Sequence, residues 1–218
     1  MDAKTRELVE QINKEYLNAE CELNFSNVYE LIVAVILSAQ CTDKRVNLTT
    51  PKLFAKYPTP QALAKADLLD VEQIIKPCGF YHNKAKHLIE MAADVVAKFN
   101  GEIPKEKADL VSLAGVGEKT ANVVLATAYN VPAIAVDTHV FRVSNRLGLA
   151  NADAPLKTQK ELERKIDSKY WINLHYALVL HGRYICKAIK PKCNECVFAK
   201  NCKFYKQKLK NQSKTFKK

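Results

Sequence analysis

The amino-acid sequence predicts an all-α protein of 218 residues. Apolar residues recur at the helical spacing of three and four through most of the chain. Proline and glycine residues divide the chain into segments of helical length. The best strand-like run is residues 133–136, and one short run without an alternating partner does not make a sheet.

Four segments carry the helical pattern most clearly. Residues 27–39 are apolar on nearly every side, which predicts a central, buried helix. Residues 81–99 carry an apolar stripe that ends at an Asn-Gly pair, a typical helix C-terminus. The pattern continues at residues 121–128, and a long helical stretch begins near Tyr170.

The length of the chain suits one large or two modest domains. No Gly/Ser-rich linker interrupts it, so two domains would pack closely, with a boundary near Pro132.

The charge balance favours a polyanionic partner. The chain has 34 Lys and Arg against 23 Asp and Glu, a net charge of +11. Residues 203–218 hold seven lysines and no acidic residue, and we expect this tail to be solvated and disordered.

No segment predicts membrane insertion or export. The longest apolar stretch, residues 31–37, is too short to span a bilayer, and residues 1–10 lack the apolar core of a signal peptide. We expect a cytoplasmic monomer with its cysteines reduced.

The segment at residues 113–120 reads Leu-Ala-Gly-Val-Gly-Glu-Lys-Thr. Gly115 and Gly117 allow a tight turn and a close approach to a ligand, and the amides at the following helix start form an anion site. A phosphate is the natural anion. Lys119 lies in the first turn, where the helix dipole disfavours its charged form and so favours a nucleophilic amine. The alternative is an ordinary solvated lysine.

Asp137 comes 18 residues after Lys119 and precedes another apolar-periodic helix. Alone, it reads as a helix N-cap. A carboxylate held at a helix start also stays ionised, and it could stabilise positive charge on a reacting sugar or assist the proton transfers of an amine.

Four cysteines, Cys186, Cys193, Cys196 and Cys202, have the spacing Cys-x6-Cys-x2-Cys-x5-Cys. Four thiolates in one loop predict a metal centre, either tetrahedral zinc or a cubane iron–sulfur cluster. The single Cys-x2-Cys pair slightly favours the cluster, and lysines around the loop suit phosphate contacts. The other three cysteines are expected to be buried apolar residues: Cys21, Cys41 and Cys78.

Taken together, these motifs resemble the endonuclease III family. The hairpin, the segment at 136–143, the run Leu-Ser-Ala-Gln-Cys-Thr-Asp at 37–43 and the four-cysteine loop occur in the family's order and at matching separations. The resemblance implies two helical domains flanking a DNA-binding cleft. Residues 22–132 would form a six-helix barrel with a helix-hairpin-helix motif, and residues 1–21 plus 133–218 a domain with one [4Fe-4S] cluster and the basic tail.

The resemblance also implies an activity on double-stranded DNA. Family members excise oxidised pyrimidines such as thymine glycol and then nick the strand at the abasic site. Lys119 would attack the sugar C1′, displace the base and form a Schiff base that permits β-elimination. Asp137 would assist electrostatically.

Further DNA-binding roles are implied for three residues. Gln40 would enter the gap left by the flipped nucleotide, and Phe80 stands where the family has a leucine wedge. His139 would contact a phosphate.

Two departures from the family lie in the hairpin. Ala114 replaces the usual proline, and Glu118 stands where a basic residue is common. A less rigid loop and an added negative charge predict weaker DNA affinity with the chemistry retained.

Two alternatives stay open at this point. An adenine mismatch glycosylase would share the cysteine loop and the aspartate, but it normally lacks the hairpin lysine and carries a further C-terminal domain, whereas this chain ends 16 residues after Cys202. A non-catalytic DNA-binding protein with a structural metal would explain the hairpin but not Lys119 together with Asp137.

Overall fold

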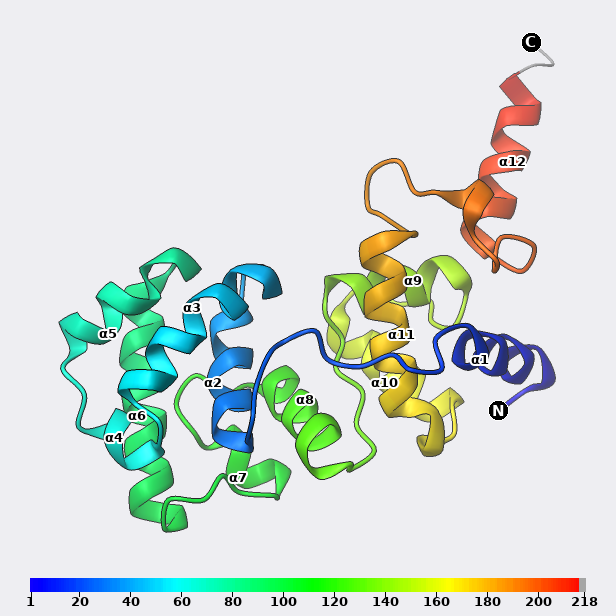
Figure 1. The fold of residues 1–218 in the computed structure, drawn as a ribbon. Coiled ribbons are helices and arrows are strands. Elements are labelled where there is room, and N and C mark those ends of the chain that lie inside the picture. The colour runs from blue at the N-terminus through cyan, green and yellow to red at the C-terminus, as the bar shows by residue number, and fades with distance from the viewer. Residues whose placement is uncertain (216–218) are drawn as a thin grey trace. The chain divides into compact units, whose positions relative to one another are not determined.

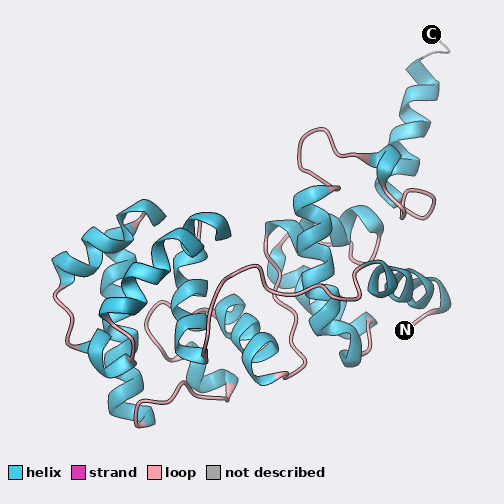
Figure 2. Cartoon of the chain, in the orientation of Figure 1, coloured by secondary structure: helices cyan, strands magenta, loops and turns pink. Residues whose placement is uncertain are grey.

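The computed structural model describes residues 1–215, with side chains to residue 211. These residues form helices joined by loops, and no strand occurs among them (Figure 1, Figure 2). The all-α prediction is therefore confirmed for the described chain. The strand-like run at 133–136 is a buried irregular segment. No described helix has both the length and the apolar character that crossing a membrane requires.

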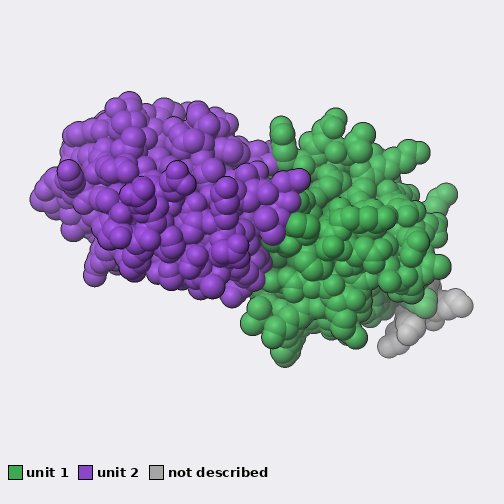
Figure 3. Space-filling model, turned by 90° about the horizontal axis from the view of Figure 1, so that it is seen from below, with its two compact units in different colours: residues 1–20, 132–218 green, residues 21–131 purple. Residues whose placement is uncertain are grey.

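The chain forms two compact units (Figure 3). We call residues 21–131 the hairpin unit, and residues 1–20 together with 132–218 the cysteine unit. The helices of the hairpin unit are α2 (Val28–Ser38), α3 (Asp43–Lys56), α4 (Pro60–Ala64), α5 (Leu68–Ile75), α6 (Tyr81–Phe99), α7 (Lys107–Val111) and α8 (Glu118–Tyr129), with the 3-10 turn η1 (Lys76–Cys78).

Helix α2 lies at the centre of the hairpin unit. Residues 31–37 are each at most 5% exposed, so the helix is buried on every side, as its all-round apolar sequence predicts. It packs against α3, α6 and α8. Each large apolar side chain buried here contributes about 1.5–3 kcal/mol. Helix α2 therefore provides a rigid base for the loops at its ends.

Helix α6 ends as predicted. Asn100 adopts a left-handed conformation with φ of 55°, and the amide of Gly101 donates to the carbonyl of Val95. Helix α6 packs against α2, α4 and α5. Its N-terminus begins immediately after Phe80, so the start of this helix determines where that side chain lies.

The cysteine unit is organised around α11, which packs against α1 and α9. Helix α9 also contacts α10 and α12, and the shared core includes Val140, Val143 and Leu174. The elements of this unit are α1 (Ala3–Glu15), α9 (Thr138–Leu147), α10 (Pro155–Lys165), η2 (Ser168–Tyr170), α11 (Trp171–Tyr184), η3 (Cys193–Glu195) and α12 (Lys203–Thr215).

The lysine-rich tail differs from the expectation of disorder. Residues 203–215 form helix α12, because Phe204 and Tyr205 pack against the core of the cysteine unit. The guanidinium of Arg146 also lies 4.4 Å from the centre of the Phe204 ring. Two tail lysines, Lys217 and Lys218, lie outside the described residues.

Candidate functional site

The hairpin joins α7 to α8 and is held by two buried side chains. Leu113 is 2% exposed and Val116 is 5% exposed, whereas Gly115 and Gly117 between and after them face solvent. Gly115 has φ of +74°, and a Cβ atom at this position would lie 2.9 Å from Cβ of His87. Only glycine fits both the backbone and the space, so the hairpin tip follows directly from the sequence.

Helix α8 follows the hairpin directly, and its N-cap residue has no side chain to cap it. This residue is Gly117, and as a glycine it provides no side-chain cap for the first-turn amides of α8. The positive end of the helix is therefore open to an anion. Lys119 lies in this first turn and is exposed. The amine of Lys119 and the backbone amides that form the anion site therefore belong to residues at most three positions apart in the sequence.

The side chain of Glu118, beside this anion site, is paired with a lysine. Its carboxylate forms an ion pair of 2.6 Å with Nζ of Lys107 at the start of α7. Both side chains are well exposed, so the pair contributes little to stability. Its effect is to neutralise one lysine beside the hairpin and to hold the negative charge of Glu118 against that lysine.

Replacing Glu118 with lysine should therefore strengthen DNA binding. The substitution removes the carboxylate and frees Lys107, and the logarithm of the binding constant should fall more steeply with the logarithm of salt concentration, by about one unit of slope or more. Fluorescence anisotropy on a duplex at several salt concentrations measures this slope. The control is Glu90→Lys, the same charge change on the exposed surface of α6; equal slopes for the two variants would mean that position 118 does not face the phosphates.

Asp137 is the N-cap of α9. One carboxylate oxygen, Oδ1, accepts hydrogen bonds from the amides of His139 and Val140, both at 2.8 Å. The side chain is half-buried, and within the described residues Oδ2 has no hydrogen-bond donor. The N-cap prediction is confirmed. One oxygen fixes the carboxylate and the other is available to a ligand, so the two interpretations of Asp137 are compatible.

His139 is less accessible than its proposed phosphate contact suggests. The ring is half-buried, Nδ1 lies 3.2 Å from a guanidinium nitrogen of Arg142, and its Cβ lies where a side chain on Gly182 would have to go. Burial lowers the pKa of His139 and Arg142 adds to this effect, while the Asp137 carboxylate opposes it. The histidine is therefore held in its neutral form, and its phosphate contact stays a prediction.

Gln40 and Phe80 both lie in exposed turns with left-handed backbone. Gln40, beyond the end of α2, has φ of 53°, and Phe80, before α6, has φ of 48°. Phe80 is 67% exposed. A large aromatic side chain that is this exposed on a strained backbone contributes little to the core, so packing alone does not explain Phe80.

The predicted residues therefore fall into two groups. The hairpin unit carries Lys119, the hairpin glycines, Gln40 and Phe80, with α2 and α8 packed against each other. The cysteine unit carries Asp137, His139 and the four cysteines.

All four cysteines of the C-terminal loop line one cavity. Cys186, Cys193, Cys196 and Cys202 surround it together with apolar side chains such as Ile185. Among the described residues, however, no three Cys, His, Asp or Glu side chains lie close enough to share a single metal ion. The thiols thus surround a space without converging on one point.

Burial disfavours the thiolate form of two of these cysteines, Cys196 and Cys202. It raises the pKa of Cys196 to about 11, with smaller contributions from the neighbouring cysteines, and it raises the pKa of Cys202. Buried thiolates need positive charge nearby, which a metal centre supplies. Outside this loop, only Cys78 is fully buried as expected, whereas Cys21 and Cys41 are half-buried.

The sequence interpretation missed the residues that hold the cysteine loop. Arg142 donates to the carbonyls of Cys186 and Gly182 at 3.0 and 2.9 Å. Arg146, one turn later, donates to the carbonyls of Lys187 and Ala188 at 2.7 and 3.1 Å and lies 3.5 Å from Sγ of Cys186. Two arginines four apart in an amphipathic helix are the only sequence signal, and it is weak.

A third missed residue, His181, faces the cysteines from α11. Its Nδ1 lies 2.9 Å from the Tyr16 hydroxyl, and its Nε2 lies 3.6 Å from Sγ of Cys196. Burial lowers the pKa of His181 to about 4, so the ring is neutral. In the tautomer whose Nδ1 accepts from the Tyr16 hydroxyl, Nε2–H faces Sγ of Cys196 and can donate to it.

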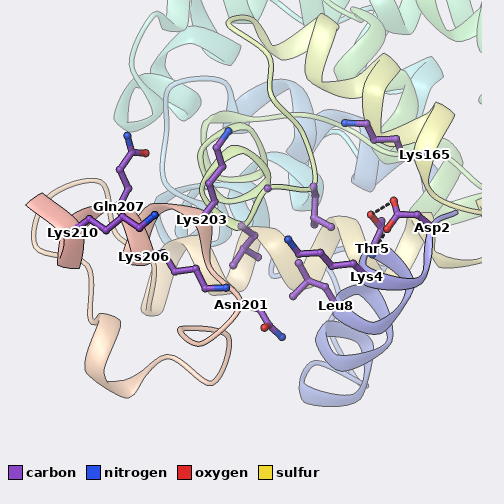
Figure 4. A pocket seen from close by; sticks show the side chains of 13 residues that line it. Asp2, Lys4, Thr5, Leu8, Lys165, Asn201, Lys203, Lys206, Gln207 and Lys210 are labelled. Atoms are coloured by element: carbon purple, nitrogen blue, oxygen red, sulfur yellow. Dashed lines mark hydrogen bonds between the residues drawn. The ribbon is translucent and has the colours of Figure 1, made fainter.

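A second cavity of the cysteine unit, of about 640 Å³, is basic (Figure 4). Lysines from α1, α10 and α12 line it; among them, Lys165 pairs with Glu161 at 2.7 Å, and Lys203 donates to Asn151 at 2.8 Å. The lining lysines are Lys4, Lys165, Lys203, Lys206 and Lys210.

Comparisons with known proteins agree with this geometry. The family model described as HhH-GPD superfamily base excision DNA repair protein matches residues 33–168. Endonuclease III of Bacillus subtilis (strain 168) is 46% identical over 196 residues, which are 89% of this chain and 90% of that protein. The chain belongs to the endonuclease III family. The Escherichia coli (strain K12) endonuclease III is 41% identical to this family member over 207 residues, 95% of this chain and 98% of that protein.

Solved structures give the same result for this endonuclease III family member. A non-covalent endonuclease III–DNA complex matches it with a TM-score of 0.90 at 43% identity, covering 96% of this chain and 100% of that chain. A trapped endonuclease III–DNA covalent intermediate matches equally well, at 42% identity and the same coverage. The resemblance inferred from the motifs is confirmed.

Proposed function

We propose that this protein removes oxidised pyrimidines from duplex DNA and then cleaves the strand at the abasic site. The observation that carries the proposal is Lys119, an exposed amine in the first turn of an uncapped helix directly after a two-glycine hairpin. The hairpin amides would bind the DNA backbone, which places the amine beside a sugar. Family membership, with relatives named endonuclease III, supports the same activity over both alternatives.

In the first step, Nζ of Lys119 attacks C1′ of the damaged nucleotide. The bond from C1′ to the base breaks, and the base leaves with the electron pair and takes up a proton. The attacking nitrogen gives up one of its two protons. The C1′–O4′ bond then breaks as the nitrogen lone pair forms the C1′=Nζ double bond, and O4′ takes up a proton. Nζ keeps its other proton, so the product is a protonated Schiff base.

In the second step, the Schiff base acts as the electron acceptor. A base removes a proton from C2′, the electrons move toward the iminium, and the bond from C3′ to its phosphate oxygen breaks. Hydrolysis then releases Lys119 and leaves an unsaturated sugar on the cut strand. A single lysine thus serves both steps.

Asp137 is proposed to stabilise the developing positive charge. Oδ1 is occupied by two backbone amides, which fixes the carboxylate, and Oδ2 is left for the sugar or for the attacking amine. Since Lys119 and Asp137 must act on one nucleotide, we propose that the two units are the two domains of the family and that DNA binds to both.

Opening of the duplex is assigned to Gln40 and Phe80. A base in the stack is out of reach, so its nucleotide must be flipped, at a cost of a few kcal/mol that is lower for damaged bases. Gln40 and Phe80 are exposed side chains on fixed turns, so they could fill the gap that the flipped nucleotide leaves in the duplex. The flat ring of Phe80 would stack on the neighbouring bases, whereas the family's leucine acts as a wedge.

We propose one [4Fe-4S] cluster on Cys186, Cys193, Cys196 and Cys202. The four thiols surround one cavity without converging on a point, which suits a cubane with one thiolate for each iron more than a single zinc ion. Bound there, the cluster would hold the loop together and compensate the buried thiolates. The reaction itself needs only Lys119 and Asp137. This assignment fits a cytoplasmic enzyme whose thiols are reduced during assembly.

Protein purified in air should therefore be yellow-brown, with broad visible absorption and equal amounts of iron and acid-labile sulfide. Elemental analysis and absorption spectra measure this directly. Colourless protein with stoichiometric zinc would rule out the cluster. The Cys196→Ser variant should lose the colour, whereas Cys21→Ser, outside the loop, should keep it.

A panel of duplexes tests the activity, each with a single defined lesion. Base release is measured by alkaline cleavage of abasic products, and strand nicking by direct electrophoresis. A duplex with thymine glycol should give both products, and an undamaged duplex neither. Processing of an adenine mispair without thymine glycol activity would support the adenine glycosylase instead, and DNA binding without any product would support the non-catalytic protein.

A further inference from the structure

A buried lysine joins the two turns that carry Gln40 and Phe80. Lys84, in the first turn of α6, is 6% exposed. Its Nζ donates to the carbonyls of Leu37 and Cys78, both at 3.0 Å. Leu37 is near the end of α2 and Cys78 is the last residue of η1, so one ammonium group connects two segments 41 residues apart in the sequence.

The carbonyl of Leu37 would otherwise have no helical partner. In a continuing helix it would accept from the amide of Cys41, but that amide bonds to the carbonyl of Ser38 at 3.1 Å instead. The ammonium of Lys84 thus satisfies an end carbonyl of α2 and lies at the negative end of that helix. Its position is determined by hydrogen bonds as well as by packing.

Burying this charge is unfavourable, which indicates a specific role. Desolvation lowers the pKa of Lys84, and the nearby thiols of Cys41 and Cys78 oppose that effect. An apolar side chain of similar length would fill the same space without the cost of desolvating a charge. The lysine supplies what an apolar residue cannot, namely two donated hydrogen bonds.

The two bonded carbonyls lie directly before the strained turns. Leu37 is three residues before Gln40, and Cys78 is two residues before Phe80, with Gly79 between at φ of 66°. Each non-glycine left-handed residue costs on the order of 1 kcal/mol and persists only where its surroundings fix it.

One further contact joins the same part of the fold. Nη1 of Arg45, just beyond the Gln40 turn, donates to the carbonyl of Pro77, just before the Phe80 turn, at 3.4 Å. The turns are therefore cross-linked by two cationic side chains, of which Lys84 is the one that bonds to both backbones.

We infer that Lys84 is a positioning residue that locks the Gln40 and Phe80 turns together, so that both side chains enter the duplex as one rigid unit. The inference rests on the proposed function, because it assigns Lys84 to the flipping step. A pre-organised pair of side chains does not lose conformational freedom when it enters the DNA, which favours the flipped state. Lys84 itself touches neither the sugar nor the base.

The test separates flipping from chemistry. The Lys84→Met variant, as the full-length metal-containing protein, is compared with wild type on a thymine glycol duplex and on a single-stranded oligonucleotide with a preformed abasic site, which needs no flipping. Single-turnover cleavage of the duplex should fall by about 10- to 100-fold, since small misplacement of positioning groups has effects of this size. Cleavage of the single strand should stay within about twofold of wild type. Lys86→Met, an exposed lysine of the same helix, is the matched control.

A second comparison asks whether Lys84 acts through the turns. In a Gln40→Ala, Phe80→Ala background, adding Lys84→Met should cost less than about twofold, because the side chains that it positions are gone. A fluorescent base analogue beside the lesion should report a smaller flipped fraction for Lys84→Met than for wild type.

The outcomes distinguish this inference from the proposed function. If wild type cleaves neither substrate, the proposed function fails. If wild type cleaves both and Lys84→Met is unchanged, or loses activity equally on both substrates, the positioning role is wrong. Lys84→Gln, which keeps an amide donor, provides the same comparison if Lys84→Met does not fold.

Discussion

Lys119→Ala should form no covalent adduct with damaged DNA when borohydride is present, and its strand cleavage should fall by at least about 10³-fold. Borohydride reduces a Schiff base to a stable amine, so the adduct reports directly on the attacking nitrogen. The amine of Lys119 is exposed at the start of α8, and no other group in the hairpin can replace it. Gel electrophoresis of the protein–DNA adduct and single-turnover nicking measure the two effects.

The control is Lys105→Ala, another exposed lysine of the hairpin unit, which should trap DNA as wild type does. Since Lys119 is exposed, its removal should leave the thermal midpoint of unfolding nearly unchanged. An adduct of undiminished yield in Lys119→Ala would assign the nucleophile to a different residue.

Asp137→Asn should lower the cleavage rate by about 10²-fold while leaving the protein folded. Asparagine is as good an N-cap as aspartate, so Oδ1 can still accept from the amides of His139 and Val140. The substitution removes the negative charge alone. Single-turnover rates on a thymine glycol duplex, together with urea unfolding, separate the two roles.

Asp137→Ala is the companion variant. It loses both the charge and the cap, and its free energy of unfolding should fall by about 1 kcal/mol. If Asp137→Asn keeps full activity and only Asp137→Ala is impaired, Asp137 is a structural cap and the positive charge on the sugar is stabilised by another group.

Local patterns predicted the local features of this molecule. The continuous apolar sequence of α2 predicted its burial, an Asn-Gly pair predicted the end of α6, and Asp137 was predicted as a cap. Gly115 was predicted at the hairpin because a tight turn needs its backbone. Each of these depends on residues within one or two helical turns, which is the range over which sequence periodicity is informative.

Contacts between distant segments were not predicted. Arg142 and Arg146 act on residues 40 or more positions later, and Lys84 bonds to a carbonyl 47 positions earlier. Lys84 did leave a signal, since it is a lysine within the buried stripe of α6 beside Ala85 and Leu88. The tail was misjudged because two aromatic residues, Phe204 and Tyr205, outweigh its lysines by packing on the core.

Helix α9 joins two parts of the proposed function. It has ten residues, about 15 Å, with Asp137 at one end and, toward the other, the arginines that bond to the carbonyls of the cysteine loop. Under the proposed function, the helix that begins at the assisting carboxylate is also the helix that braces the loop proposed to hold the cluster. Damage to that loop would then reach the cutting site through a single helix of about three turns.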